Sequence, residues 1–112
     1  MNFSESLRKN YMFQSVYKNG KSYANKLFVM YVLPNQENGN RIGISVSKKV
    51  GNSVVRHRVK RLVRENYRLH ENVFNSGLDI VIVARQSAAE ATYSEVESAI
   101  LHLGRLHNII NM

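Results

Sequence analysis

The sequence predicts a two-layer α/β (α+β) sandwich with a small sheet, in which the elements follow the order α-β-β-α-β-α. Three segments rich in β-branched, aromatic or other apolar residues, at 22–33, 41–47 and 78–85, predict the strands. Apolar residues three and four positions apart predict helices before the first strand, between the second and third, and after the last. A chain of 112 residues with 44% hydrophobic residues suits a single domain over residues 1–112 with one core.

The first element is a short helix. Asn10 is a suitable N-cap, because its side chain accepts hydrogen bonds from N–H groups of the first turn. Phe13, Val16 and Tyr17 then recur at helical spacing. Gly20 follows as a residue that ends helices, so the pattern predicts a short helix between Asn10 and Gly20.

Two strands follow, separated by a turn. The segment "KSYANKLFVMYVL" predicts a strand over residues 22–33, and "RIGISVS" predicts a second strand over residues 41–47. The intervening "PNQENGN", at residues 34–40, contains an Asn-Gly pair that is typical of turns. If this turn closes a hairpin, the two strands are antiparallel neighbours.

The C-terminal half is predicted to contain a long helix to about residue 72, a buried strand and a final helix. Gly77 precedes "LDIVIVAR", a continuous apolar run that is typical of a buried strand, so the second strand, the long helix and this strand form a βαβ crossover. Thr92 and Glu95 fit a capping box at the start of the last helix. The apolar stripe of that helix consists of Val96, Ala99, Ile100, Leu103 and Leu106.

The composition excludes several kinds of site. The chain contains no cysteine, which excludes disulfides, thiolate metal ligands and a cysteine nucleophile. No apolar run approaches the roughly 18 residues that cross a membrane, and the N-terminal "MNFSESLRKNYMF" lacks the apolar stretch of a signal peptide. We therefore expect a soluble, cytoplasmic protein.

Positive charge is concentrated in one segment. The net charge is +8 and the isoelectric point is about 10.1. Residues 41–68 contain nine Lys and Arg residues against a single acidic residue, Glu65, whereas the rest of the chain contains seven of each sign. Such a block indicates a polyanionic partner, either a nucleic acid or an anionic membrane surface.

The long helix divides most of this segment into two faces. At 100° per residue, one narrow stripe is apolar and is predicted to face the core: Val55, Val59, Leu62, Val63 and Leu69. Most of the remaining arc is basic, and we call it the cationic ridge: Arg56, His57, Arg58, Lys60, Arg61, Arg64 and Arg68. Glu65 lies one turn beyond Arg61 and is expected to pair with it.

Two other interpretations of the ridge fit its sequence less well than nucleic-acid binding. A solvated helix face usually mixes both signs of charge, whereas this one has a single acidic residue. A membrane-surface helix needs an apolar face that is free to insert, but the valine-rich stripe here is needed for the core. Because forked guanidinium groups match phosphate oxygens, the arginine-rich pattern favours a structured nucleic acid.

The loop "SKKVGN" before the helix also suits a phosphate group. Gly51 has wide backbone freedom, and Asn52 is a good N-cap. The free N–H groups of the first helical turn lie beside Lys48 and Lys49. The loop is not a nucleotide P-loop, because the G-K-[ST] ending is missing.

The central stretch "KKVGNSVVRHRVKRLVRE" resembles the signature of the bacterial ribonuclease P protein subunit, K-K-x-G-N-A-V-x-R-N-R-x-K-R-x-x-R. Upstream, "NYMFQSVYKNGKSYANKLFVMYVL" is similar to the first helix and strand of that family, and "DIVIVARQSAAEATYSEVESAILHL" is similar to its last strand and helix. The resemblance covers nearly the whole chain. It implies a mixed sheet with a left-handed βαβ crossover, against the usual handedness, in a ribosomal-protein-S5-domain-2-like fold.

The resemblance also implies a role. In that family the protein is the non-catalytic subunit of an endoribonuclease, and a large catalytic RNA removes the 5′ leader from precursor tRNA. The Mg²⁺ ions are held mainly by the RNA, and none is bound tightly by the protein. The implied partners are therefore the ribonuclease P RNA and precursor tRNA, with no membrane, and the protein is expected to be monomeric outside the holoenzyme.

The family motif also assigns binding residues at matching positions. Together with Arg68 of the ridge, the implied RNA-binding residues are Lys48, Lys49, Gly51, Asn52, Arg56, Arg58, Lys60, Arg61 and Arg64. A cleft for the single-stranded leader is implied at Phe13, Tyr17, Val29 and Tyr31, bordered by Lys60 and Arg64. The chain departs from the motif at Ser53, where Ala is usual, and at His57, where Asn is usual, which leaves open any polar contact at position 57.

Other interpretations concern the aromatic and ionisable residues. By spacing alone, Phe13, Tyr17 and Tyr31 also fit core aromatics, and their use for stacking bases comes from the resemblance. The four histidines lack metal-ligand spacing and the carboxylates form no cluster, so nuclease chemistry is expected from the partner. Two further hypotheses stay open: a ribosomal or accessory RNA-binding module, and a protein-only nuclease that uses histidine and lysine.

Overall fold

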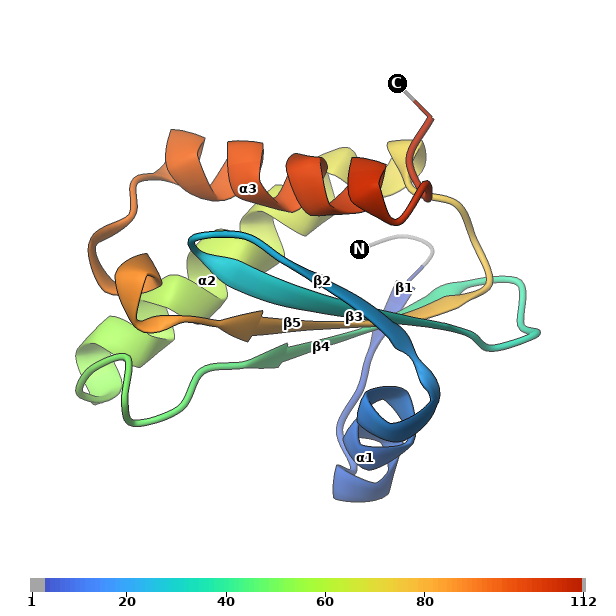
Figure 1. The fold of residues 1–112 in the computed structure, drawn as a ribbon, viewed down its shortest axis with the longest axis horizontal. Helices are drawn as coiled ribbons and strands as arrows, with labels where there is room; N and C mark the ends of the chain where they lie inside the picture. The colour runs from blue at the N-terminus through green and yellow to red at the C-terminus, as the bar shows by residue number, and fades with distance from the viewer. Residues whose placement is uncertain (1–3, 112) are drawn as a thin grey trace.

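The computed structural model describes residues 4–111, which form a five-stranded mixed sheet with helices on both faces (Figure 1). The strands, in the spatial order β1-β4-β5-β3-β2, are β1 (Ser4–Ser6), β2 (Lys21–Ala24), β3 (Phe28–Pro34), β4 (Asn40–Ser45) and β5 (Leu78–Ala84). The helices are α1 (Asn10–Asn19), α2 (Ser53–His70) and α3 (Tyr93–Leu106), with short 3₁₀ turns η1 (Glu71–Val73) and η2 (Gln86–Glu90). Within the described part of the chain, none of these helices could span a bilayer.

The predicted fold class is confirmed. Helix α2 connects β4 to β5, and these two strands are parallel neighbours, as a βαβ unit requires. Helices α2 and α3 lie over one face of the sheet, and α1 lies alone on the other (Figure 1). The capping box at the start of α3 is also present, with the Thr92 and Glu95 side chains each accepting a hydrogen bond from the other's backbone N–H.

The first predicted strand is in fact two strands. Residues 22–33 divide into β2 and β3, which pair with each other in antiparallel register. Asn25 forms the turn, because its side-chain oxygen accepts hydrogen bonds from the N–H groups of Leu27 and Phe28. An asparagine side chain that replaces backbone contacts in this way is a common turn device, but the surrounding apolar residues hide it in the sequence.

The predicted hairpin between residues 22–33 and 41–47 is wrong. Strands β3 and β4 do not pair, because β5 lies between them, antiparallel to β3 and parallel to β4. Six of the seven residues of β5 are buried. A strand that is apolar on both faces is most stable in the middle of a sheet, which explains why it displaces the expected hairpin partner.

The N-terminal region departs from the prediction in two ways. Strand β1 lies at the sheet edge, parallel to β4, although its sequence "SES" carries no strand signal. Helix α1 begins at Asn10 itself, with Lys9 at the N-cap position and no side-chain cap, so the assignment of Asn10 as the cap is wrong.

Helix α2 docks by an apolar stripe that differs from the predicted one at its C-terminal end. Val59 and Val63 are fully buried, and Val55 and Leu62 pack against the same core. Leu69, in contrast, is 52% exposed, so its assignment to the core is wrong. Tyr67 is fully buried instead, one turn beyond Val63, and its ring packs 5.1 Å from that of Phe74.

Candidate nucleic-acid interface

The loop before α2 folds closely against the first turn of the helix. The Asn52 side chain accepts a hydrogen bond from the N–H of Val55 at 3.0 Å, which confirms the predicted N-cap. A methyl group at Gly51 would lie 2.8 Å from the Val55 side chain, so only glycine fits at this close approach. Lys48 and Lys49 are exposed beside this compact loop.

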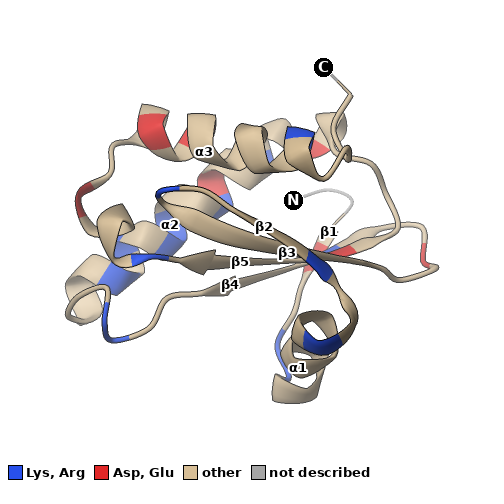
Figure 2. Cartoon of the chain, viewed as in Figure 1, with Lys and Arg blue, Asp and Glu red and all other residues tan. Residues whose placement is uncertain are grey.

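Most of the predicted RNA-binding cations are open to solvent. Figure 2 shows basic residues along α2 and the preceding loop, whereas acidic residues lie mainly on α3 and near the turn between β3 and β4. The Lys60, Arg61 and Arg64 side chains line a shallow depression of about 170 Å³ together with His57 and Glu65. Five of the predicted RNA-binding cations are exposed and form no ion pair among residues 4–111, and we call them the open cations: Lys48, Lys49, Lys60, Arg61 and Arg64.

Arg58 of the ridge differs from the open cations because it is engaged inside the protein. Its guanidinium group donates hydrogen bonds to the backbone carbonyl oxygens of Ala89 and Ala91, at 3.3 and 2.7 Å. These carbonyls lie at the end of η2, just before α3. Arg58 therefore ties α2 to the segment that leads into α3. Arg56 is also partly buried, and its Nε atom has no hydrogen-bond partner within the described chain.

The ion pair predicted between Arg61 and Glu65 is wrong. Glu65 instead accepts two hydrogen bonds from Arg68, at 2.5 and 3.2 Å, and both side chains are about half exposed. The hydrogen bonds from Arg68 lower the pKa of the Glu65 carboxyl group. The only acidic residue within the basic segment thus compensates Arg68 and leaves Arg61 open.

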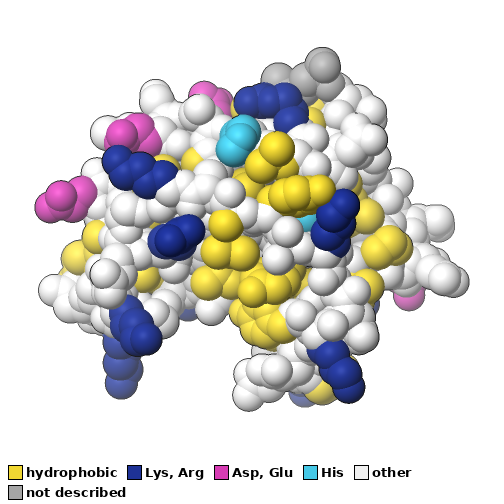
Figure 3. Space-filling model, in the orientation of Figure 1, with side chains coloured by type: hydrophobic (Ala, Val, Ile, Leu, Met, Phe, Trp, Pro, Cys, Tyr) yellow, Lys and Arg dark blue, Asp and Glu magenta, His cyan; other side chains and the backbone are white. Residues whose placement is uncertain are grey.

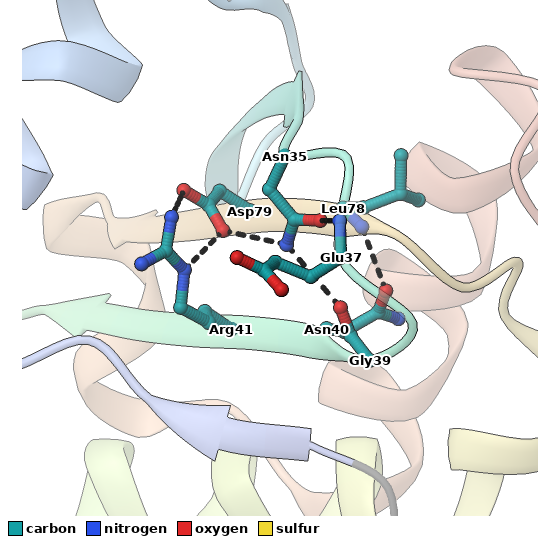
Figure 4. A network of polar contacts seen from close by, with 7 residues as sticks. All are labelled: Asn35, Glu37, Gly39, Asn40, Arg41, Leu78 and Asp79. Carbon is teal, nitrogen blue, oxygen red and sulfur yellow. Dashed lines mark hydrogen bonds and ion pairs between the residues drawn. The ribbon is translucent and has the colours of Figure 1, made fainter.

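Arg41 belongs to the basic segment of the sequence but is paired at the other end of β4 (Figure 4). Its guanidinium group forms two hydrogen bonds of 2.7 Å with the carboxylate of Asp79, a side chain that is almost completely buried. Asn35 donates a third hydrogen bond to this carboxylate, at 2.9 Å. The contact with Asp79 raises the pKa of Arg41, so the pair stays charged and its positive charge is locally balanced.

This polar cluster was missed at the level of sequence. Asp79 is the second residue of β5, and it pairs with Leu33 and Arg41 of the neighbouring strands. A carboxylate within a buried apolar run needs a partner, and that requirement is the signal that could have identified Arg41. Asn40, next to Arg41, extends the cluster by donating to the carbonyl of Asn75 and accepting from the N–H of Leu78.

The residues of the predicted leader cleft lie together on the α1 face of the sheet. The rings of Phe13 and Tyr17 are 6.4 Å apart, and the ring of Tyr17 meets that of Tyr31 edge-on at 5.0 Å. Val29 is two residues before Tyr31 on β3 and therefore lies on the same face. All four side chains are partly exposed, so they are not part of a closed core.

A small buried apolar cluster lies beneath the cleft. Figure 3 shows hydrophobic side chains gathered in the middle of one face, between α3 above and α1 below, with lysine and arginine side chains around them. The cleft aromatics rest on a small cluster formed by the buried residues Leu7, Val16 and Val81. This arrangement leaves ring faces and edges accessible while their positions are held by packing.

The histidines make internal contacts or lie exposed. His107 hydrogen-bonds to the carbonyl of Met30 at 2.7 Å, and burial lowers its pKa. His70 lies 3.2 Å from a carboxylate oxygen of Glu97, and His102 contacts the Asn25 side chain. His57 is exposed on the ridge. Within residues 4–111, no three His, Asp or Glu side chains come close enough together to hold a metal ion.

Comparison with known proteins decides the family. The family described as Ribonuclease P matches residues 1–107. The chain belongs to the ribonuclease P protein family. It is 62% identical to the ribonuclease P protein component of Lachnoclostridium phytofermentans, over 96% of this chain and 93% of that one. It is 55% identical to the component of Alkaliphilus oremlandii, over 94% and 92% of the two chains.

Solved structures of ribonuclease P proteins share the fold. The Staphylococcus aureus RNase P protein is 38% identical, with a TM-score of 0.87 over 95% of this chain and 97% of that one. The Thermotoga maritima protein is 33% identical, with a TM-score of 0.83 over 90% and 96%. The family resemblance predicted from the basic motif is therefore confirmed. Membership of this ribonuclease P family places the chain in tRNA processing, as the protein component of an endoribonuclease holoenzyme that has an RNA partner.

Proposed function

We propose that the chain binds the catalytic RNA of ribonuclease P through the cationic ridge and the loop before it, and binds the 5′ leader of precursor tRNA in the α1 cleft. The protein thereby assists Mg²⁺-dependent endonucleolytic removal of the leader, which produces the mature 5′ end. The observation that carries this proposal is the set of open cations, which lie on α2 and in the loop before it, while the opposite side of α2 is fixed in the core.

The open cations suit the phosphate backbone of a folded RNA. Lys60 and Arg61 are neighbours in α2, and Arg64 follows about one turn later. These three cations form no ion pair with an acidic residue among residues 4–111. Exposed like charges on one helix repel each other, so they are most stable when phosphates lie among them. Because α2 is held by Val59 and Val63, the charges keep a fixed spacing. Such a rigid array favours a structured partner over a flexible one.

The cleft suits unpaired nucleotides. Bases of single-stranded RNA stack on aromatic side chains, and each stack contributes about 1–3 kcal/mol by alanine substitution. Phe13, Tyr17 and Tyr31 supply three partly exposed rings in contact, and Val29 extends the apolar surface beside them. Stacking tolerates any base, as a protein that handles many precursor tRNAs requires.

The chemistry is assigned to the RNA. Mg²⁺ binds through several oxygen ligands, chiefly carboxylates and phosphates. The residues present do not fit a resident magnesium site, since no carboxylate cluster forms within residues 4–111. A Mg²⁺ ion held by the RNA would supply activation of water and stabilisation of a leaving oxygen. The protein's own residues bind and orient the two RNA molecules, and outside the holoenzyme we expect it to be a monomer.

Reconstitution tests the proposal. The purified protein is mixed with a bacterial ribonuclease P RNA, and cleavage of a precursor tRNA is measured as Mg²⁺ is lowered. We expect the protein to stimulate cleavage most at low Mg²⁺, because its cations replace part of the ionic screening. Absence of stimulation contradicts the proposal. Tighter binding to ribosomal RNA than to ribonuclease P RNA would favour an accessory module, and RNA cleavage by the protein alone, abolished by His57→Ala, would favour a protein nuclease.

A further inference from the structure

We propose that Gly43 of β4 is a positioning residue for the leader cleft: its lack of a side chain seats the Phe13 ring against the sheet and so sets the aromatic row of α1. The inference rests on the proposed function, because it concerns how the same cleft is built. Gly43 is buried, belongs to none of the predicted binding residues, and lies under the helix that carries Phe13 and Tyr17.

Strand register explains why position 43 matters to the cleft. Gly43 of β4 is paired with Val81 of β5, and Val81 is paired with Tyr31 of β3. Directly paired residues on neighbouring strands share a face of the sheet, so these three form one row across it. Helix α1 lies along this row, with the Phe13 ring at its glycine end and the Tyr17 ring against Tyr31 at its other end. The two ends of the row therefore fix the two aromatic residues of α1.

The contact at the glycine end leaves no room for a side chain. A methyl group on Gly43 would lie 2.6 Å from Cε1 and 2.7 Å from Cζ of Phe13, and 3.1 Å from Cδ1 of Leu7. Ordinary carbon–carbon contacts are about 3.5–4.0 Å. Any residue other than glycine therefore displaces the Phe13 ring by on the order of 1 Å, given that contact distance.

The kind of atom that is displaced decides the consequence. At Gly43 the nearest atoms belong to the tip of a partly exposed ring, which is free to swing away from the sheet. At Gly20, in contrast, a methyl group would lie 2.5 Å from the backbone oxygen of Val16 and 3.0 Å from that of Val32, which cannot move without the chain. We therefore expect alanine at position 20 to disturb the fold and alanine at position 43 to move Phe13 and leave the sheet in place.

The glycine is not explained by strand stability. Glycine within a strand is unfavourable compared with residues that have a side chain, and it often marks a close approach by another group. Here that approaching group is the Phe13 ring. Alanine at position 43 would make the backbone of β4 more rigid but would prevent the Phe13 ring from packing against the strand. We therefore expect leader binding and unfolding free energy to respond differently to this change.

The test uses the reconstituted holoenzyme with Gly43→Ala. Binding is compared for a precursor tRNA with a leader of about ten nucleotides and for the same tRNA with a mature 5′ end. We expect affinity for the precursor to fall about five- to tenfold, which is at the lower end of the loss expected when one base–aromatic stack is removed. The affinities for mature tRNA and for the ribonuclease P RNA should stay unchanged.

A matched glycine supplies the control. Gly104 lies in α3, on the opposite face of the sheet from the cleft (Figure 1). In Gly104→Ala, the added methyl group would lie 2.8 Å from Cγ2 of Ile110, which is again a side-chain atom. This variant introduces a comparable clash away from the cleft. Its binding of precursor and mature tRNA should equal that of the parent. An equal loss of leader affinity in Gly104→Ala would overturn the inference, because the effect would then follow general destabilisation.

Phe13→Ala separates the inference from the proposed function. If Gly43 acts through Phe13, adding Gly43→Ala to Phe13→Ala causes no further loss of leader affinity or of unfolding free energy. If the losses of the two single variants add up in the double variant, the inference is overturned. It is also overturned if Phe13→Ala loses leader affinity while Gly43→Ala keeps the full affinity. If Gly43→Ala fails to fold, recovery of folding in the double variant supports the inference and continued failure overturns it. Full leader affinity in Phe13→Ala itself contradicts the cleft of the proposed function.

Discussion

The open cations of α2 and Arg41 of β4 come from the same basic segment of the sequence, but they have opposite environments. Lys60, Arg61 and Arg64 are exposed, and no ion pair within the described chain involves them. Arg41 is held by two 2.7 Å hydrogen bonds to the buried carboxylate of Asp79. The contrast shows that buried internal acceptors, and not position in the basic segment alone, decide which cations are left free for a polyanion.

Two residues lie between these extremes. Arg58 is on the ridge, but its guanidinium group donates to the Ala89 and Ala91 carbonyls, so it acts first as an internal clamp. Arg68 is paired with Glu65 at the surface, where solvent screens the pair and an RNA phosphate can compete for the guanidinium group. The basic segment is therefore graded from open to fully engaged, and each grade predicts a different response to mutation.

The largest effect is expected for the open cations. Replacing Lys60, Arg61 and Arg64 together by alanine should lower the affinity for ribonuclease P RNA by about a thousandfold, since each charged contact is worth about 1.5 kcal/mol or more. The slope of log affinity against log salt concentration should fall by about two to three, while unfolding free energy changes by less than about 0.5 kcal/mol per residue. Filter binding at several salt concentrations and urea unfolding measure the two quantities.

A control with the same loss of charge tests whether position matters. Lys21, Lys26 and Arg105 are exposed and lie on β2, the following turn and α3. Replacing these three by alanine should leave the salt slope within about one unit of the parent, because net charge away from the contact acts only at long range. Equal losses in both triple variants would show that total charge, and not the ridge, governs binding.

The next effect concerns stability and not binding. Asp79→Ala leaves the Arg41 guanidinium without its carboxylate and removes one of the two acceptors of the Asn35 amide. The unfolding free energy should fall by about 2–3 kcal/mol, less than for a fully buried pair because Arg41 is partly exposed. The folded variant should bind RNA with an unchanged salt slope. A slope that rises by about one would show that Arg41 reaches the RNA once it is released, and the contrast with the open cations would then fail.

Arg58→Ala gives a smaller loss. The variant removes two hydrogen bonds and leaves the carbonyl of the buried Ala91 without a donor, which should cost about 1–2 kcal/mol of unfolding free energy. Because these contacts are internal, the salt slope of RNA binding should stay the same. Arg64→Ala is the matched control on the same helix: it should lower the slope by about one and leave stability unchanged. A fall in slope for Arg58→Ala would instead place Arg58 among the direct RNA contacts.

The sequence predicted the parts of the fold that depend on local periodicity. The capping box of Thr92 and Glu95, the N-cap Asn52 and the buried positions Val59 and Val63 are all confirmed. Strand order was not predictable in the same way. The apolar character of β5 indicates burial, but it does not show which strands flank it. The Asn25 turn and strand β1 were missed because each depends on contacts with residues elsewhere in the fold.

The site was predictable as a surface and not as a set of contacts. Charge and helical spacing identified the ridge, and the family motif identified its partner. They could not distinguish open cations from engaged ones, because the acceptors of Arg58 lie 31 and 33 residues away and the carboxylate of Arg41 lies 38 residues away. Gly43 was missed for the same reason: its significance comes from Phe13 of α1, which the chain brings to it only on folding.

The smallest effect is expected at the surface pair of Glu65 and Arg68. Glu65→Gln removes the negative charge and releases Arg68 toward solvent, so RNA affinity should rise about two- to threefold, with a slightly steeper salt slope. Filter binding at low salt measures this change. Arg68→Ala should lower RNA affinity by about two- to threefold at most, because the charge of Arg68 is already compensated by Glu65. A loss of affinity in Glu65→Gln would mean that the pair holds Arg68 in the orientation that contacts RNA.

The same pair predicts a dependence on pH with a defined sign. The hydrogen bonds from Arg68 lower the pKa of Glu65 below its ordinary value of 4.5, so the unfolded chain takes up this proton at a higher pH than the folded one. The stabilisation is therefore fully present above pH 4.5 and is lost as the pH falls through the lowered value. Between pH 7 and 5.5 the difference in RNA affinity between parent and Glu65→Gln should stay constant. If that difference shrinks within this range, a group other than Glu65 titrates in the parent and the assignment to Glu65 fails.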